Sequence, residues 1–101
     1  MNWATRVINE LREGKIAKCR PHGGSMRGRI ESGQLVTLDP HLEPKVGDAA
    51  LVRVRGNTYI HLVKAIQEME SKKKRYLIGN NHGRINGWTT TVYGTVIKVE
   101  D

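Results

Sequence analysis

The chain has little of what would cross-link it or anchor it in a membrane. Its 101 residues include a single cysteine and no phenylalanine. No apolar run reaches the ~18 residues needed to cross a bilayer, and no charged start leads into the apolar stretch of a signal peptide. Cys19 alone cannot form an internal disulfide, which favours the reducing cytoplasm. We therefore expect a cytoplasmic protein without a membrane contact.

Two further absences narrow the chemistry. The four histidines and the one cysteine are scattered along the chain, so they lack the spacing of a zinc site. No glycine motif for binding phosphates or dinucleotides occurs. We therefore expect no metal and no cofactor. The length favours one domain, because a chain this short buries a single core.

Positive charge is what the chain has in excess, with 17 Lys and Arg against 10 Asp and Glu. Part of the excess is one run of consecutive residues: Lys72, Lys73, Lys74 and Arg75. Such a run attracts phosphates or acidic protein surfaces. Few aromatic residues lie among the charges to stack on bases. The pattern therefore favours a solvated hairpin tip over a nucleic-acid-binding segment.

The first 14 residues are predicted to form a helix. Asn2 is a candidate N-cap, and Gly14 is a candidate C-terminal residue. Between them apolar residues recur at helical spacing: Trp3, Val7, Ile8 and Leu11. An isolated helix this short is marginal in water, so we expect it to brace the rest of the domain.

After Gly14 the pattern changes to that of strands separated by turn residues. The expected strands are 34–38, 49–54, 58–67, 75–78 and 90–99. Residues 79–88 are rich in Gly and Asn and are expected to form a shaped loop. The predicted fold is mainly β, a bent antiparallel sheet or partly open barrel over residues 19–101 with one N-terminal helix.

Ser25 is the candidate nucleophile because it follows two glycines in a turn just before the strands. A serine hydroxyl is a poor nucleophile unless a nearby base takes its proton. The expected strand 58–67 offers two bases, His61 and Lys64. Alternation along a strand places Tyr59, His61 and Val63 on one face and Lys64 on the other. Only one of the two bases can therefore serve Ser25 unless a bulge intervenes.

An ordered series of short motifs gives the chain a resemblance to a known fold. The series is Gly24-Ser25-Met26, Ser32-Gly33-Gln34-Leu35-Val36, Val46-Gly47-Asp48, Tyr59-Ile60-His61-Leu62-Val63, Ile78-Gly79-Asn80-Asn81 and Val92-Tyr93-Gly94-Thr95-Val96. It resembles the catalytic fold shared by the LexA/UmuD-type peptidases and the type I signal peptidases. The resemblance implies that Ser25 is the nucleophile. His61-Leu62-Val63 is similar to the His-Arg-Val motif of histidine-base signal peptidases, which implies that His61 is the base.

The resemblance also implies supporting roles. Backbone N–H groups at Gly24 and Ser25 would stabilise the oxyanion of an acyl-transfer intermediate, and Met26 would pack below the nucleophile. Asn80 is a candidate to orient the imidazole. His82 is a candidate to support the site or contact substrate, and Lys64 remains the rival base.

Four positions depart from the family pattern. Gly23 stands where some signal peptidases place a hydroxyl residue that completes the oxyanion hole. Gly28 stands where proline is usual, and Gln34 stands where aspartate is usual. Asn80 stands where the family's late Gly-Asp-Asn element has its aspartate. A carboxylate that would support a histidine base is therefore missing. In a chymotrypsin-type triad the equivalent Asp-to-Asn change costs about 10⁴ in rate.

Two functions therefore stay open. The first is a serine endopeptidase with a Ser25/His61 dyad, to which an extended peptide adds along a sheet edge. The second is a catalytically inactive relative that binds a protein partner through the same groove, as UmuD-like proteins do. Association as a homodimer and nucleic acid bound through residues 72–75 are the remaining alternatives. Neither a membrane anchor nor a helix-turn-helix domain is seen, so a signal peptidase and a complete LexA-like repressor are not expected.

Overall fold

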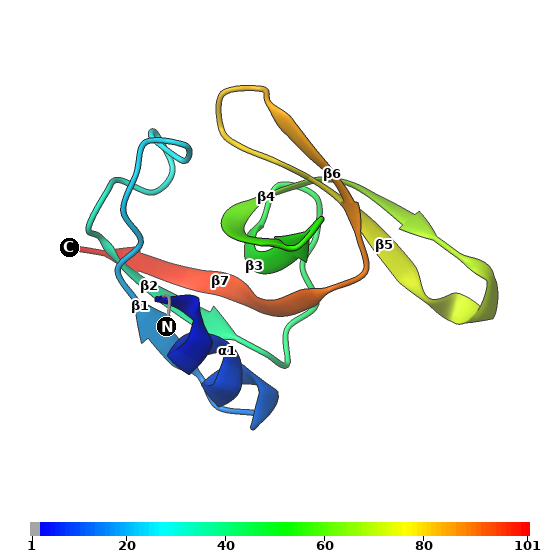
Figure 1. Cartoon of the computed structure of the whole chain (residues 1–101), viewed down its shortest axis with the longest axis horizontal. Coiled ribbons are helices and arrows are strands. Elements are labelled where there is room, and N and C mark those ends of the chain that lie inside the picture. The colour runs from blue at the N-terminus through cyan, green and yellow to red at the C-terminus, as the bar shows by residue number, and fades with distance from the viewer. Residues whose placement is uncertain (1–2) are drawn as a thin grey trace.

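The computed structural model describes residues 3–101, which form a short helix followed by a bent antiparallel sheet (Figure 1). The elements are α1 (Ala4–Arg12), β1 (Ala17–Cys19), β2 (Leu35–Asp39), β3 (Ala49–Val54), β4 (Asn57–Glu68), the 3-10 turn η1 (Glu70–Lys72), β5 (Lys74–Gly79), β6 (Ile85–Thr89) and β7 (Val92–Glu100). The strand order is β1-β2-β7-β3-β4-β5-β6. The end strands β1 and β6 do not pair with each other, so the sheet is open. The predicted mainly-β fold with an N-terminal helix is confirmed.

The helix α1 braces the sheet through one apolar face. Ala4, Val7 and Leu11 are buried, and the helix contacts β1 and β7. The predicted stripe is therefore confirmed for Val7 and Leu11, but Trp3 precedes the helix and is 48% exposed. The predicted N-cap, Asn2, lies outside the described residues. No helix in the described part of the chain is long and apolar enough to cross a membrane.

The expected strands all appear, with ends within two residues of those predicted. The prediction of one loop over 79–88 was wrong for its second half, because β6 begins at Ile85 and pairs with β5. Gly87 lets this strand bend close to the β3–β4 turn. It adopts φ +133°, and a Cβ there would lie 3.4 Å from the side chain of Val54. Gly87, one of the glycines that suggested a loop, therefore lies in a bent strand instead.

β4 positions the site because its residues alternate between two cores. Ile60 and Leu62 belong to the core that includes the buried face of α1. Val63 belongs to the second core, against which Tyr59 packs. The ring of Tyr59 stacks on that of His61, with 4.7 Å between centroids. The predicted alternation is therefore confirmed, and a register shift against β5 falls between Val63 and Ala65.

Candidate active site

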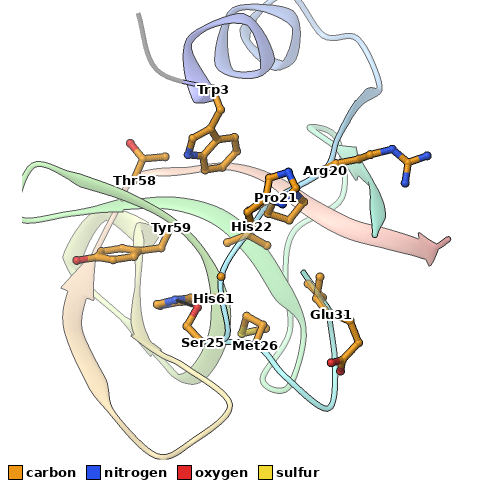
Figure 2. A pocket seen from close by; sticks show the side chains of 13 residues that line it. Trp3, Arg20, Pro21, His22, Ser25, Met26, Glu31, Thr58, Tyr59 and His61 are labelled. Atoms are coloured by element: carbon orange, nitrogen blue, oxygen red, sulfur yellow. Dashed lines mark hydrogen bonds between the residues drawn. The ribbon is translucent and has the colours of Figure 1, made fainter. Parts of the chain in front are cut away.

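The structure brings Ser25 and His61 together. His61 Nε2 lies 3.0 Å from Ser25 Oγ, within the hydrogen-bond reach that a nucleophile and its base require. The histidine projects from β4, whereas the serine lies in the turns between β1 and β2 (Figure 2). Of the two candidate bases on β4, His61 is the one in contact with the serine.

The turn that carries Ser25 is fixed to the core just after the serine. Met26 and Ile30 are 5% and 4% exposed, and both belong to the core below α1. The backbone N–H of Ile30 donates to the carbonyl of Met26 over 2.8 Å. Met26 and Ile30 therefore act as two apolar anchors that attach the turn of Ser25 to the core.

Gly28 shows why this turn departs from the family pattern. Its φ is +97°, which proline cannot adopt because its ring holds φ near −65°. Its N–H donates to Glu31 Oε2 over 2.7 Å, a bond that proline, having no N–H, would lose. The glycine is therefore required by the path of the backbone, and a Cβ there would also lie 3.0 Å from Asn81 Nδ2.

Asn86 orients the imidazole. Its Oδ1 lies 2.7 Å from His61 Nδ1. An amide oxygen only accepts hydrogen bonds, so this contact keeps the proton on Nδ1. The lone pair of Nε2 then faces Ser25 Oγ, which is the arrangement a general base needs.

Burial sets the acid–base behaviour of His61. The side chain is 6% exposed, and this burial lowers the pKa of His61 below its ordinary value of 6.5. The hydrogen bond with Asn86 raises the pKa, but by less than burial lowers it. The imidazole is therefore neutral at pH 7 and free to accept a proton.

Asn80, the residue expected to orient the imidazole, makes other contacts. Its Oδ1 accepts the backbone N–H groups of His82 and Arg84, over 2.8 and 3.0 Å. It therefore shapes the loop between β5 and β6. Sequence reasoning misses Asn86 because the Gly and Asn content of residues 79–88 predicts one loop, in which no side-chain direction can be assigned. A strand starting at Ile85 is the signal that would have given one.

His82 supports the serine turn from the same loop. Its Nε2 lies 2.9 Å from the carbonyl oxygen of Gly24. The neighbouring Asn81 donates from its backbone N–H to the carbonyl of Ser25 over 3.0 Å. His82 thus contacts the residue before Ser25, and its supporting role at the site stays a prediction. Lys64 instead packs its Cε against Gly79.

Two backbone N–H groups at the turn of Ser25 have no acceptor in the described part of the chain. Within residues 3–101, no backbone or side-chain acceptor is found for the N–H groups of Gly24 and Ser25. Unpaired N–H groups beside a nucleophile are the donors from which an oxyanion hole is built. The two amides are therefore available for the role that the sequence suggested.

A cavity of about 270 Å³ lies beside the dyad. Figure 2 shows Ser25 and His61 at one end and Trp3 at the other, with Tyr59 and Pro21 on opposite sides. Ser25 and His61 therefore line a cavity rather than a flat surface.

The basic run at residues 72–75 is partly engaged within the protein. Lys74 Nζ lies 2.8 Å from Glu43 Oε1. The guanidinium of Arg75 lies 4.3 Å from the centroid of the Trp88 ring. Two of the four cations therefore already have partners near the β4–β5 hairpin, which projects from one end of the molecule (Figure 1).

What the site can do chemically is inferred from its own residues. Comparison with known protein families and with curated protein sequences found no match. In the part of the chain that the structure describes, no three His, Cys, Asp or Glu side chains gather into a candidate metal site. The site places the hydroxyl of Ser25 next to the buried imidazole of His61, whose orientation is set by Asn86.

Proposed function

We propose that the protein is a serine endopeptidase of the LexA–signal peptidase type, with Ser25 as nucleophile and His61 as general base. One observation carries the proposal: His61 Nε2 lies 3.0 Å from Ser25 Oγ, while Asn86 holds the other ring nitrogen. The motif series and the open antiparallel sheet support the same assignment.

The reaction follows from this geometry. Ser25 Oγ attacks the peptide carbonyl carbon as its proton passes to His61 Nε2. The resulting oxyanion is held by the N–H groups of Gly24 and Ser25. The C–N bond breaks, and the imidazolium gives its proton to the leaving amine. Water, deprotonated by the same imidazole, then cleaves the acyl ester and restores the Ser25 hydroxyl.

A fluorophosphonate probe tests the proposal, because it reacts with a serine hydroxyl only when a base activates it. We expect labelling of the wild-type protein, and Ser25→Ala and His61→Ala should each abolish it. Ser32→Ala is the matched control: Ser32 is a nearby exposed serine whose Oγ lies by His22 and not by His61. Equal labelling of the wild-type protein and Ser25→Ala would rule the proposal out.

A catalytically inactive, protein-binding relative is the second candidate, and Asn86 is the observation that favours it. An amide cannot balance the charge of an imidazolium as a carboxylate does. A silent relative would show no labelling in the wild-type protein. Its partner would remain bound in a pull-down when Ser25 and His61 are both changed to alanine, whereas loss of binding in that double variant would weaken this alternative.

A further inference from the structure

Trp3 is a large aromatic residue that the core does not use. It is 48% exposed and lies just before α1, as the residue that caps the N-terminal end of that helix. Yet its indole forms one end of the cavity whose other end holds Ser25 (Figure 2). A tryptophan placed in this way offers a wide apolar surface to whatever enters the cavity.

The remaining walls of the cavity are mostly apolar. They come from the strand β4 and from the segment that follows β1: Pro21, Met26, Ile30, Tyr59 and Ile60. The two charged residues in the lining are already bonded within the loop. Arg20 Nη1 donates to the carbonyl of Gly33 over 2.9 Å, and Glu31 Oε2 accepts the N–H of Gly28. The cavity therefore offers an incoming group mainly apolar contact, and each of its two charged side chains already makes a hydrogen bond to the backbone.

The size of the cavity limits its occupant. Its volume of about 270 Å³ is just below the range of roughly 300–1,000 Å³ typical of small-molecule sites. It therefore has room for one or two side chains and not for a folded segment. Because Ser25 and His61 both line it, a side chain seated there belongs to a residue close to the attacked carbonyl.

From these three observations we propose that Trp3 is a specificity-determining residue, and that the cavity takes an apolar side chain of the size of leucine or methionine. This side chain belongs to the substrate residue whose carbonyl Ser25 attacks. The inference rests on the proposed peptidase function and names its substrate class: peptides with a bulky apolar residue on the N-terminal side of the cleaved bond. The N-terminal end of the chain then serves the site as well as the fold, because Trp3, which caps α1, forms the end wall of the cavity.

Peptide-like phosphonates test this inference without requiring turnover. N-acetyl aminoalkyl diphenyl phosphonates with leucine, alanine or aspartate side chains would be incubated with the full chain. In each reaction a bond forms between Ser25 Oγ and phosphorus, phenoxide leaves, and the serine proton passes to His61. The rate of adduct formation is measured by intact-protein mass. We expect the leucine analogue to react about 10- to 100-fold faster than the alanine analogue, and the aspartate analogue to be the slowest.

Variants assign the preference to Trp3. We expect Trp3→Ala to reduce the leucine-to-alanine rate ratio by about tenfold. Trp3→Phe should keep most of the preference. Trp88→Ala is the matched control, because Trp88 is 39% exposed on β6 and does not line the cavity.

The failures of the two proposals are distinguishable. If a small fluorophosphonate does not label Ser25, the peptidase function is overturned. If Ser25 is labelled but the three phosphonates react at equal rates, the inference about the cavity is overturned and the peptidase function remains. The role of Trp3 is likewise overturned if Trp3→Ala leaves the rate ratio unchanged.

Discussion

Asn86 limits how strong a base His61 can be. The amide fixes the ring and its proton, but it is neutral and cannot balance the imidazolium that the proposed attack on a peptide would form. In a triad of the chymotrypsin type, asparagine at this position puts the imidazole in the wrong tautomer. Here the amide oxygen faces Nδ1, with 2.7 Å between the atoms. The tautomer is therefore correct, and only the charge is missing.

Asn86→Asp should supply that charge. We expect fluorophosphonate labelling of Ser25 to become faster by about tenfold or more, and its pH midpoint to rise because a carboxylate stabilises the imidazolium. Asn80→Asp is the matched control. It places the same carboxylate where it accepts two backbone N–H groups of the loop, so no gain is expected. Slower labelling of Asn86→Asp would contradict the assigned role of Asn86.

The pH dependence of the labelling rate of the wild-type protein reports the protonation of His61. Burial lowers the pKa of His61 below 6.5, so the neutral, basic form persists to lower pH than usual. The labelling rate should rise with pH through a midpoint below 6.5 and then stay level. Measurement between about pH 4.5 and 8 covers this range. A midpoint well above 6.5 that moves in Lys64→Met would instead identify Lys64 as the base.

At the scale of the elements, the site depends on a close approach between the end of β5 and the backbone of the loop that follows it. A Cβ on Gly79 would lie 2.6 Å from the carbonyl oxygen of Arg84 and 3.0 Å from Lys64 Cε. The first neighbour is backbone and cannot swing away. A glycine here lets the β5–β6 loop fold back tightly, and that loop holds the turn of Ser25 through His82.

Gly79→Ala should therefore loosen this loop. We expect it to lower the free energy of unfolding by about 1–3 kcal/mol, as overpacking does, and to slow labelling of Ser25. Urea denaturation measures the first effect. Gly24→Ala is the control for stability, because the nearest atom to its new Cβ would be the flexible end of Arg27 at 3.8 Å. Equal stability of the two variants would show that the loop can shift without cost.

At the scale of the whole molecule, the central strand β3 carries the stability of the sheet. It pairs with both β4 and β7, and Leu51 on it is fully buried. Leu51→Ala should cost about 2–5 kcal/mol, a large share of the 5–15 kcal/mol typical of whole domains. Leu42→Ala, at a residue that is 47% exposed, should change stability by less than about 0.5 kcal/mol. A small loss for Leu51→Ala in urea denaturation would contradict this assignment of the core.

The sequence by itself determined the local features of this protein. Alternation and turn residues placed five strands to within two residues, and they put His61 on the face opposite Lys64. Only the tertiary structure decided which side chains meet. Asn86 reaches His61, and Trp3 faces Ser25 across a cavity, because the sheet bends and α1 packs on it. Those distances depend on strand register and curvature, which arise from packing over the whole chain and leave no local pattern in the residues themselves.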